Sequence, residues 1–444
     1  MNDKMPMQLS NSLGIKEFFV KNLDQIIAIF FVIIFFFWYA KFGIRLAQGI
    51  YFDYMNLAFD FDPPLFIQRN STDVNYKHPL ISLFSSFSTP FSILNFSKKE
   101  AAVLVMALFG GLTTATVYQF SRFANFGRPE AFAGTIFFAV SSTPVFTSII
   151  MESYGFSSFC IALVWCLFMK QCAYPTNNSM SGHLVAAILV TGATVTNIVN
   201  SFVAVFFILN KKMSLQKSLI RTSLFCMAAI LGLVVILAIL QPTGLLNVMY
   251  HPVKAAKDIY WLKSNTADAG LIELLRTYFV YSFFSPDFTK VFLSDDVFMI
   301  DFREFNFSKN EIGLVFIWLL FLTTGIFLGL KNLYFRQVAI PLILIVMANL
   351  ILHLNYQFRG SIYLYAAHLH FPIFALSMGA APWITTQNFI VRLIYFCLLL
   401  TLITFALTLN TRHVSDFALN FEHLQFIPDT TVEFKQHKTI GFEK

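Results

Sequence analysis

The sequence has 444 residues, of which 57% are apolar and only 12% are charged, whereas soluble domains have about 45–50% apolar and about 25% charged residues. The mean hydropathy is +0.66. This composition excludes a water-soluble globular protein and indicates a polytopic membrane protein, because lipid-facing positions are apolar. The net charge of +7 does not indicate nucleic-acid binding, since the basic residues are scattered at the ends of apolar runs.

Ten apolar runs are long enough to cross the hydrocarbon core, which takes about 20 residues of helix. In chain order they are 25–45, 101–121, 131–150, 156–172, 184–209, 219–240, 312–330, 338–356, 361–381 and 389–409. The run 184–209 has a polar centre between apolar arms, which is typical of a helix broken inside the membrane. We therefore expect two short paired helices there and eleven crossings in all. A single long helix with a polar centre is the alternative.

Basic residues at the ends of these runs predict the orientation, because Lys and Arg favour the cytoplasmic side. They are Lys4, Lys16, Lys21, Arg122, Arg128, Lys211, Lys212, Lys217, Arg221, Lys331, Arg336 and Arg392. They share one side only if the run 184–209 crosses twice. The sequence thus predicts a multi-pass protein of the cell membrane, with its amino end cytoplasmic and its carboxyl end external.

The expected fold class is an all-α transmembrane bundle with external juxtamembrane helices. We expect a single transmembrane domain over residues 1–410, with external loops at 46–100 and 241–311, and a short external tail at 411–444. The stretch 79–96 is apolar but short and rich in Ser and Pro, so it predicts an interfacial or re-entrant helix.

The first external loop contains three carboxylates close to the first span. Asp53 and Asp60 are seven residues apart and would share a face of a helix. Asp60 and Asp62 flank Phe61 before a proline pair, where an extended backbone would point both side chains the same way. Paired carboxylates can chelate a hard cation or supply a general base. The alternative is a solvated acidic loop.

Other candidate residues also fall on the expected external side. Lys77 and His78 precede the short helix and could bind an anion, and Arg359 in a tight turn suits bidentate phosphate binding. Glu152 lies between two spans and His368 enters a late span, and both are candidates for acceptor binding or for a structural role. The alternatives are a proline-started helix for His78 and interface anchoring for Lys77 and Arg359.

Four segments carry a resemblance to a known family. They are YFDYMNLA with Asp53, Lys77-His78-Pro79-Leu80, the polar-centred pair ending at Lys211-Lys212, and LYAAHLHFPIFAL late in the chain. In order and spacing they resemble the polytopic membrane glycosyltransferases of the GT-C fold, especially bacterial relatives of the family 39 protein mannosyltransferases. The resemblance covers nearly all of 20–410. It departs from the family where Tyr54 follows Asp53 and where Leu80 replaces a second proline.

The resemblance implies a hexosyl- or pentosyltransferase that takes a sugar from a polyprenyl-phosphate donor at the external membrane face. The acceptor would be a lipid, a glycan or a protein. Asp53 is implied as the base that deprotonates the acceptor, with Asp60 as the second candidate. Lys77, His78 and Arg359 would bind the departing phosphate. The resemblance requires no cofactor, and a divalent cation at Asp60 and Asp62 is left open.

Two other classes fit a polytopic protein of the cell envelope. A transporter or flippase for a lipid-linked glycan would show an inverted repeat and facing ionisable residues at mid-membrane, and no repeat is visible. A polysaccharide polymerase would concentrate Arg and His in one large late external loop, whereas here the acidic cluster is early. The glycosyltransferase is the preferred interpretation.

Overall fold

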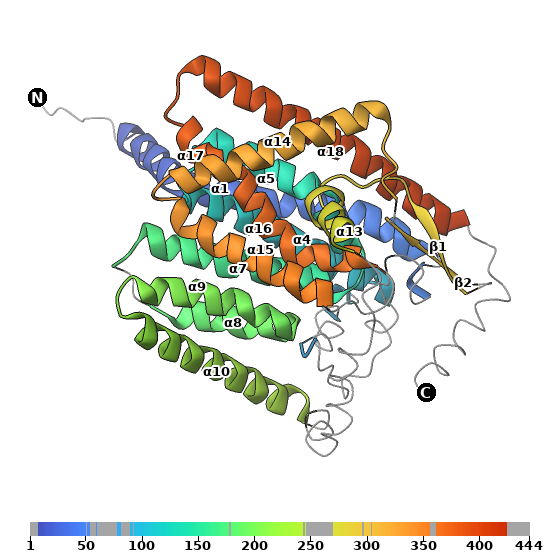
Figure 1. Cartoon of the computed structure of the whole chain (residues 1–444), viewed down its shortest axis with the longest axis horizontal. Coiled ribbons are helices and arrows are strands. Elements are labelled where there is room, and N and C mark those ends of the chain that lie inside the picture. Colours follow the sequence, from blue (N-terminus) through green and yellow to red (C-terminus); the bar gives the residue numbers. More distant parts are fainter. Residues whose placement is uncertain are drawn as a thin grey trace, which may run out of the picture.

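The computed structural model is a bundle of roughly parallel helices with one small β-hairpin (Figure 1). The residues that it describes are 8–49, 51–53, 59, 78–80, 89–91, 93–176, 179–242, 245, 270–294, 297–302, 304–355 and 361–423. Within these residues, almost all regular structure is helical. The prediction of an all-α membrane bundle is therefore confirmed.

Eight helices among the described residues are long and apolar enough to cross a membrane. They are Asn22–Gln48 within α1 (Gln8–Gln48), α4 (Lys98–Phe123), α7 (Ser153–Ala173), α10 (Leu215–Leu240), α14 (Lys309–Lys331), α15 (Arg336–Asn355), the continuous stretch Ile362–Ile384, and Phe389–Leu419 within α18 (Phe389–His423). Each coincides with a run expected from the sequence. The stretch Ile362–Ile384 comprises η6 (Ile362–Tyr365), α16 (Ala366–Ser377), η7 (Met378–Ala380) and α17 (Ala381–Ile384).

The expected span 131–150 is a bent pair of helices. α5 (Arg128–Val140) and α6 (Ser142–Ile149) meet at an angle of 57°. At the bend, the backbone N–H groups of Ser142 and Thr143 donate to the carbonyls of Phe283 and Ser282, at 3.0 and 2.9 Å. A break inside a bilayer is tolerated only when its freed backbone groups find such partners.

The polar-centred run 184–209 forms two short helices, as predicted. α8 (Ser181–Ala193) and α9 (Ile198–Asn210) are separated by the single turn η3 (Val195–Asn197). Each helix has 13 residues and is about 20 Å long, which is less than the ~30 Å of a hydrocarbon core. Together with the eight long helices and the bent pair, they account for the eleven membrane segments expected.

The bundle has a buried centre and a lipid-facing edge. All residues in the most apolar part of the stretch Ile362–Ile384 are buried, and 78% of those in the corresponding part of α4 are buried. α10 is only 22% buried, and it lies outside α8 and α9 at one edge of the bundle (Figure 1). The many exposed apolar side chains of α10 are those that a lipid-facing helix requires.

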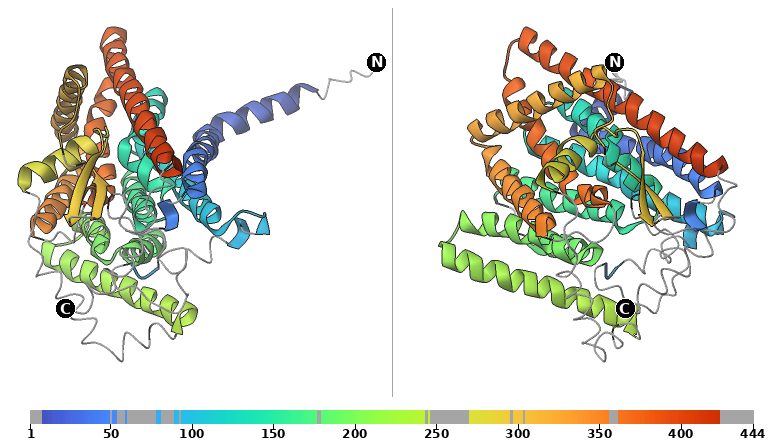
Figure 2. Two further views of the ribbon diagram at one scale, coloured as in Figure 1. Left: turned by 90° about the vertical axis from the view of Figure 1, so that its right-hand side faces the viewer. Right: turned by 45° about the vertical axis from the view of Figure 1, so that its right-hand side comes forward.

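The helix ends define two faces of the bundle. On one face short connections join successive helices, at 124–127, 211–214, 332–335 and 385–388; we call it the short-turn face. On the other, which we call the loop face, α1, α10, α15 and α18 end and α4, α7 and α14 begin. The two faces lie at opposite ends of the helices in Figure 1 and are seen from other directions in Figure 2.

The described basic residues at the short-turn face have few acidic neighbours. Asp24 pairs with Arg128 at 2.9 Å and with Arg122 at 3.2 Å, and the buried Glu130 pairs with Arg392 at 3.2 Å. The remaining basic residues there have no acidic partner among the ion pairs of the described chain; they include Lys170, Lys211, Lys217, Lys331 and Arg336. More of the described basic residues thus lie on this face than on the loop face, where Lys98, Lys99 and Lys309 flank spans.

The loop 241–311 has structure that the sequence analysis did not foresee. It contains α13 (Leu271–Arg276), the short π-helical turn η5 (Thr277–Tyr281), and an antiparallel hairpin of β1 (Thr289–Ser294) and β2 (Val297–Asp301). Phe59 of the first loop is held against this hairpin, because its N–H donates to the Ile300 carbonyl at 2.9 Å.

Two expected boundaries differ in the structure. The helix predicted over 79–96 does not begin at Pro79, because residues 78–80 form a bend and a turn; of the remainder, 89–91 and 93 are helical, and 81–88 and 92 lie outside the described residues. Helix α18 continues to His423, well past the expected end of its span at 409.

Candidate functional site

Imidazole and phenol side chains, all buried except the half-buried His78, gather at the loop face. They come from the first turn of α7, the last turn of α15, the start of the buried stretch Ile362–Ile384, the turn η5, and the segment 78–80. We call this group the imidazole–phenol cluster; its members are His78, Tyr154, Tyr278, His353, Tyr365 and His368. Tyr154, His353, Tyr365 and His368 lie near the ends of membrane helices.

One half of the cluster joins α7 to α16. The rings of Tyr154 and His368 have centroids 5.5 Å apart, and those of His78 and Tyr154 are 6.0 Å apart. Ser158, one turn further along α7, donates from its hydroxyl to the Ala367 carbonyl at 3.2 Å. This hydrogen bond fixes the start of α7 against α16, so that Tyr154 faces His368.

The other half joins α15 to η6 and η5. The rings of His353 and Tyr365 are stacked with centroids 4.2 Å apart, and the ring of Tyr278 meets His353 edge-on at 6.1 Å. Tyr278 is fully buried, and His353 and His368 are no more than 3% exposed. Burial raises the pKa of the Tyr278 phenol well above its usual value, so that this hydroxyl stays protonated.

His78 lies at the turn between α8 and α9 and contacts the end of α8. Its Nδ1 lies 2.9 Å from the Ala193 carbonyl and 3.1 Å from Thr194 Oγ1, and the Leu80 N–H donates to the Gly192 carbonyl at 2.9 Å. Residues 78–80 therefore cap the last carbonyls of α8, which have no partner within the helix. Since a carbonyl only accepts, Nδ1 carries a proton and donates it to the Ala193 carbonyl.

The structure brings only some of the expected site residues together. His78 and His368 belong to one cluster, in contact with Tyr154. Asp53 ends the short helix η1 (Tyr51–Asp53), which follows α1 at the loop face; Tyr51 anchors this turn by packing edge-on against Phe417 of α18, with ring centroids 5.2 Å apart.

Four expected site residues lie outside the described part of the chain: Asp60, Asp62, Lys77 and Arg359. The convergence of Asp53, Lys77, His78 and Arg359 therefore stays a prediction, as does a cation at Asp60 and Asp62. Within the described residues, no group of three or more His, Cys, Asp or Glu is arranged to hold a metal ion.

Glu152 is a helix cap. Its side chain is buried, and Oε1 accepts from the Ser153 N–H at 3.2 Å at the first turn of α7. A carboxylate at a helix amino terminus is stabilised by the helix dipole and by the free N–H groups there. Both roles expected for Glu152, acceptor binding and a structural role, stay predictions.

Four members of the cluster, Tyr154, Tyr278, His353 and Tyr365, were not among the expected site residues. His353 carried a usable signal, because an ionisable residue inside an apolar span is a functional candidate. Tyr278 lies in the loop 241–311 and had no such signal. His370, which neighbours His368 in sequence, lies elsewhere, with its ring 4.4 Å from Phe283 and 4.9 Å from Phe138. This agrees with the two histidines pointing to different helix faces.

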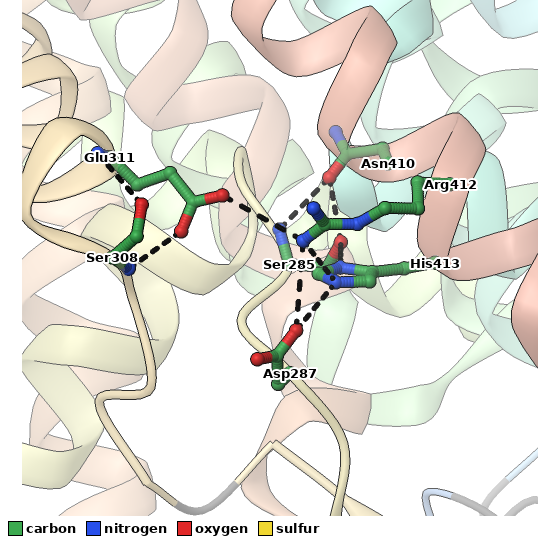
Figure 3. A network of polar contacts seen from close by, with 7 residues as sticks. All are labelled: Ser285, Asp287, Ser308, Glu311, Asn410, Arg412 and His413. Atoms are coloured by element: carbon green, nitrogen blue, oxygen red, sulfur yellow. Dashed lines mark hydrogen bonds and ion pairs between the residues drawn. The ribbon is translucent and has the colours of Figure 1, made fainter.

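A second polar network joins α18 to the segment after η5 (Figure 3). Ser285 Oγ lies 2.8 Å from His413 Nδ1, and His413 Nε2 lies 3.0 Å from Asp287 Oδ1. This order resembles a Ser-His-Asp triad. However, Ser285 is fully buried, and its hydroxyl donates to Asn410 Oδ1 at 2.8 Å. The network is therefore structural. The Ser285 hydroxyl donates its proton to the Asn410 amide oxygen, which cannot remove it, and so the hydroxyl does not donate to His413 as a nucleophilic serine would.

Comparison with known proteins identifies a similar fold but no matching sequence family. No family model matches the sequence, and no curated protein matches it. The structure resembles the archaeal oligosaccharyltransferase AglB from Archaeoglobus fulgidus, solved in complex with an inhibitory peptide and a dolichol-phosphate. The TM-score is 0.50 at 12% sequence identity. The chain has a GT-C membrane fold.

The likeness covers most of this chain but only part of the archaeal enzyme. It covers 90% of this chain but 56% of the archaeal enzyme, so the chain spans about half the length of the protein it resembles. At 12% identity the likeness shows the fold alone. The GT-C expectation is thus confirmed, whereas membership of family 39 stays a prediction.

Proposed function

We propose that this protein is a membrane glycosyltransferase that takes a sugar from a polyprenyl-phosphate donor and transfers it to a lipid, glycan or protein acceptor. The observation that carries the proposal is the likeness, over 90% of the chain, to an oligosaccharyltransferase solved with a dolichol-phosphate. The imidazole–phenol cluster at the loop face supports it, because buried polar side chains at the mouth of a helix bundle are typical of a ligand site.

The proposed chemistry divides among residues of the loop face. Asp53, at the end of α1 and η1, deprotonates the acceptor hydroxyl, with Asp60 as the second candidate. The activated hydroxyl attacks the anomeric carbon, and the sugar–phosphate bond breaks with its electrons passing to the phosphate oxygen. Lys77, His78 and Arg359 stabilise the charge that grows on this phosphate.

In the proposed orientation, the loop face is external and the short-turn face is cytoplasmic. The basic residues gathered at the short-turn face support this orientation. The donor would then reach the site from the outer leaflet, where the ends of α7, α15 and α16 meet the loops. Hexosyl and pentosyl donors both remain candidates, and a panel of lipid-linked sugars distinguishes them.

The role of Asp53 is tested by Asp53→Asn in native membranes that lack the wild-type copy. The assay follows conversion of a sugar-loaded polyprenyl phosphate to the free carrier, which needs no knowledge of the acceptor. We expect Asp53→Asn to lower turnover by about 10²–10⁴-fold, the usual contribution of a general base, without lowering the amount of protein in the membrane.

The matched control is Glu304→Gln, which neutralises an exposed carboxylate of the same face and should leave turnover unchanged. Near-normal turnover of Asp53→Asn would remove Asp53 from the role and make Asp60→Asn the next variant. Movement of the intact donor across the membrane without its consumption would instead identify a flippase.

A further inference from the structure

Two buried polar atoms of the imidazole–phenol cluster have no hydrogen-bond partner among the described residues. They are the hydroxyl of Tyr278 and Nε2 of His368. The Tyr278 side chain is fully buried and His368 is 3% exposed. Burying a polar group without a partner costs about 1–3 kcal/mol, so such groups in a native protein usually mark a bound water or a ligand.

A third unpartnered atom lies at the first residue of α7. Ser153 is fully buried, and its hydroxyl also has no partner among the described residues. It precedes Tyr154, whose ring contacts His368. Unpartnered groups therefore come from three separate elements, α7, η5 and α16, so no single local distortion accounts for them.

The cluster offers neutral hydrogen-bonding groups. His368 forms no ion pair among the described residues, and an unpaired charge buried to this degree would cost several kcal/mol, so its ring is uncharged. The Tyr278 phenol is protonated. A phosphate prefers Arg and Lys, whereas sugar hydroxyls pair well with neutral imidazole, phenol and hydroxyl groups, each of which can donate or accept.

The rings of the cluster add apolar surface around these polar atoms. His353 stacks on Tyr365, and Tyr154 lies against both His78 and His368. A few polar atoms set in apolar surroundings are the usual composition of a ligand site, where they fix the orientation of the ligand. The chemistry of the cluster matches an uncharged sugar better than it matches the phosphate.

We propose that the imidazole–phenol cluster is the subsite for the sugar of the lipid-linked donor, and that it takes an uncharged sugar. This inference rests on the proposed function. It assigns the sugar to Tyr278 and His368, while His78, which also belongs to the cluster, stays a proposed phosphate ligand with Lys77 and Arg359. Tyr278 and His368 contact the sugar hydroxyls directly. A uronic acid sugar is disfavoured, because no cationic side chain belongs to the cluster.

The test measures binding of two probes to the purified protein in nanodiscs: undecaprenyl phosphate and undecaprenyl phosphate carrying glucose, mannose or arabinose. Tyr278→Phe removes one hydroxyl and keeps the ring. We expect it to weaken binding of the preferred sugar-loaded probe by about 5–10-fold, the loss of one hydrogen bond, and to leave binding of the sugar-free probe unchanged.

Tyr281→Phe is the matched control. Tyr281 lies in the same turn, is buried, and also has a hydroxyl without a described partner, but its ring packs against Phe305 and Phe307 rather than the cluster. It should bind both probes as the wild type does. Removing an unpartnered hydroxyl should leave the thermal stability of either variant unchanged or slightly higher.

Three results would overturn the inference. They are equally weaker binding of both probes by Tyr278→Phe, unchanged binding of both probes by Tyr278→Phe, or selectively weaker binding of the sugar-loaded probe by Tyr281→Phe.

If Tyr278→Phe folds poorly, His368→Gln takes its place, and it should also weaken binding of the sugar-loaded probe alone. A wild-type protein that binds neither probe contradicts the proposed function itself. A wild type that binds the sugar-loaded probe more tightly, with no effect of Tyr278→Phe or His368→Gln, contradicts only this subsite.

Discussion

At the scale of single residues, Asn410 is the hub that holds the loop-face end of α18. Its Nδ2 donates to the carbonyls of Val140 and Phe283, both at 2.8 Å, and its Oδ1 accepts from the N–H and the hydroxyl of Ser285, at 2.9 and 2.8 Å. One buried side chain thus satisfies the backbone at the end of α5 and after η5. Such fully satisfied networks rigidify a structure and are costly to interrupt.

Replacement of Asn410 should therefore destabilise the fold. Asn410→Ala removes this partner from the buried Val140 carbonyl and Ser285 N–H, whereas the Phe283 carbonyl still accepts from Ser142, for an expected loss of about 2–6 kcal/mol at about 1–3 kcal/mol for each of the two unsatisfied groups. Thermal unfolding in detergent measures this as a lower Tm. Thr401→Ala, on the exposed side of the same helix, is the control and should change Tm little; equal effects of the two would argue against the hub.

The sequence predicted some members of the imidazole–phenol cluster and missed others for a physical reason. His78 and His368 stood out because ionisable residues are rare near apolar spans. The cluster itself joins residues as far apart in sequence as His78 and His368, and only the packing of helix ends brings them together. Tyr278 could not have been found, because a tyrosine in a long loop is unremarkable until its burial is known.

At the scale of elements, glycines permit the closest helix contacts. Gly325 of α14 faces the carbonyl of Ser377, with which an added Cβ would overlap, and a Cβ on Gly379 would lie 2.6 Å from the Gly325 carbonyl oxygen. Small residues at helix contacts let backbones approach in membranes, where packing rather than water exclusion drives association. The contact holds α14 against the buried stretch Ile362–Ile384.

Gly325→Ala should loosen this contact. The added methyl group overlaps backbone atoms rather than a movable side chain, so we expect a loss of about 1–3 kcal/mol and a lower yield of monodisperse protein. Gly313→Ala lies on the same helix, where nothing is within 4 Å of the added Cβ. It should be neutral or slightly stabilising, because alanine favours helix. A stable Gly325→Ala would refute close packing here.

The elements themselves were largely predictable, since hydropathy alone locates long apolar helices. The break in 184–209 was also predictable, because its polar centre could not face lipid. The bend between α5 and α6 was not, because its backbone partners come from residues 282 and 283, far away in sequence. The β-hairpin was likewise missed within a loop of mixed composition.

At the scale of the whole molecule, charge separates the two faces. Basic residues dominate the short-turn face, while the described charges of the loop face are of both signs, including Lys98, Glu100, Glu273, Arg276 and Glu311. This asymmetry favours a cytoplasmic short-turn face. The proposed direction of donor entry depends on it.

Cysteine labelling tests this orientation. In a variant without the five native cysteines, Gly270→Cys at the exposed start of α13 and Lys217→Cys at the exposed start of α10 report on opposite faces. A membrane-impermeant maleimide should label position 270 in intact cells and position 217 only after permeabilisation. The reverse pattern would place the loop face in the cytoplasm.

The most direct test of the whole account is a cryo-EM structure of the protein in nanodiscs with a sugar-loaded undecaprenyl phosphate. The account predicts the phosphate at the loop face and the sugar against the imidazole–phenol cluster, at the ends of α7, α15 and α16. A lipid head group bound at the short-turn face, or no bound donor at saturating concentration, would contradict it.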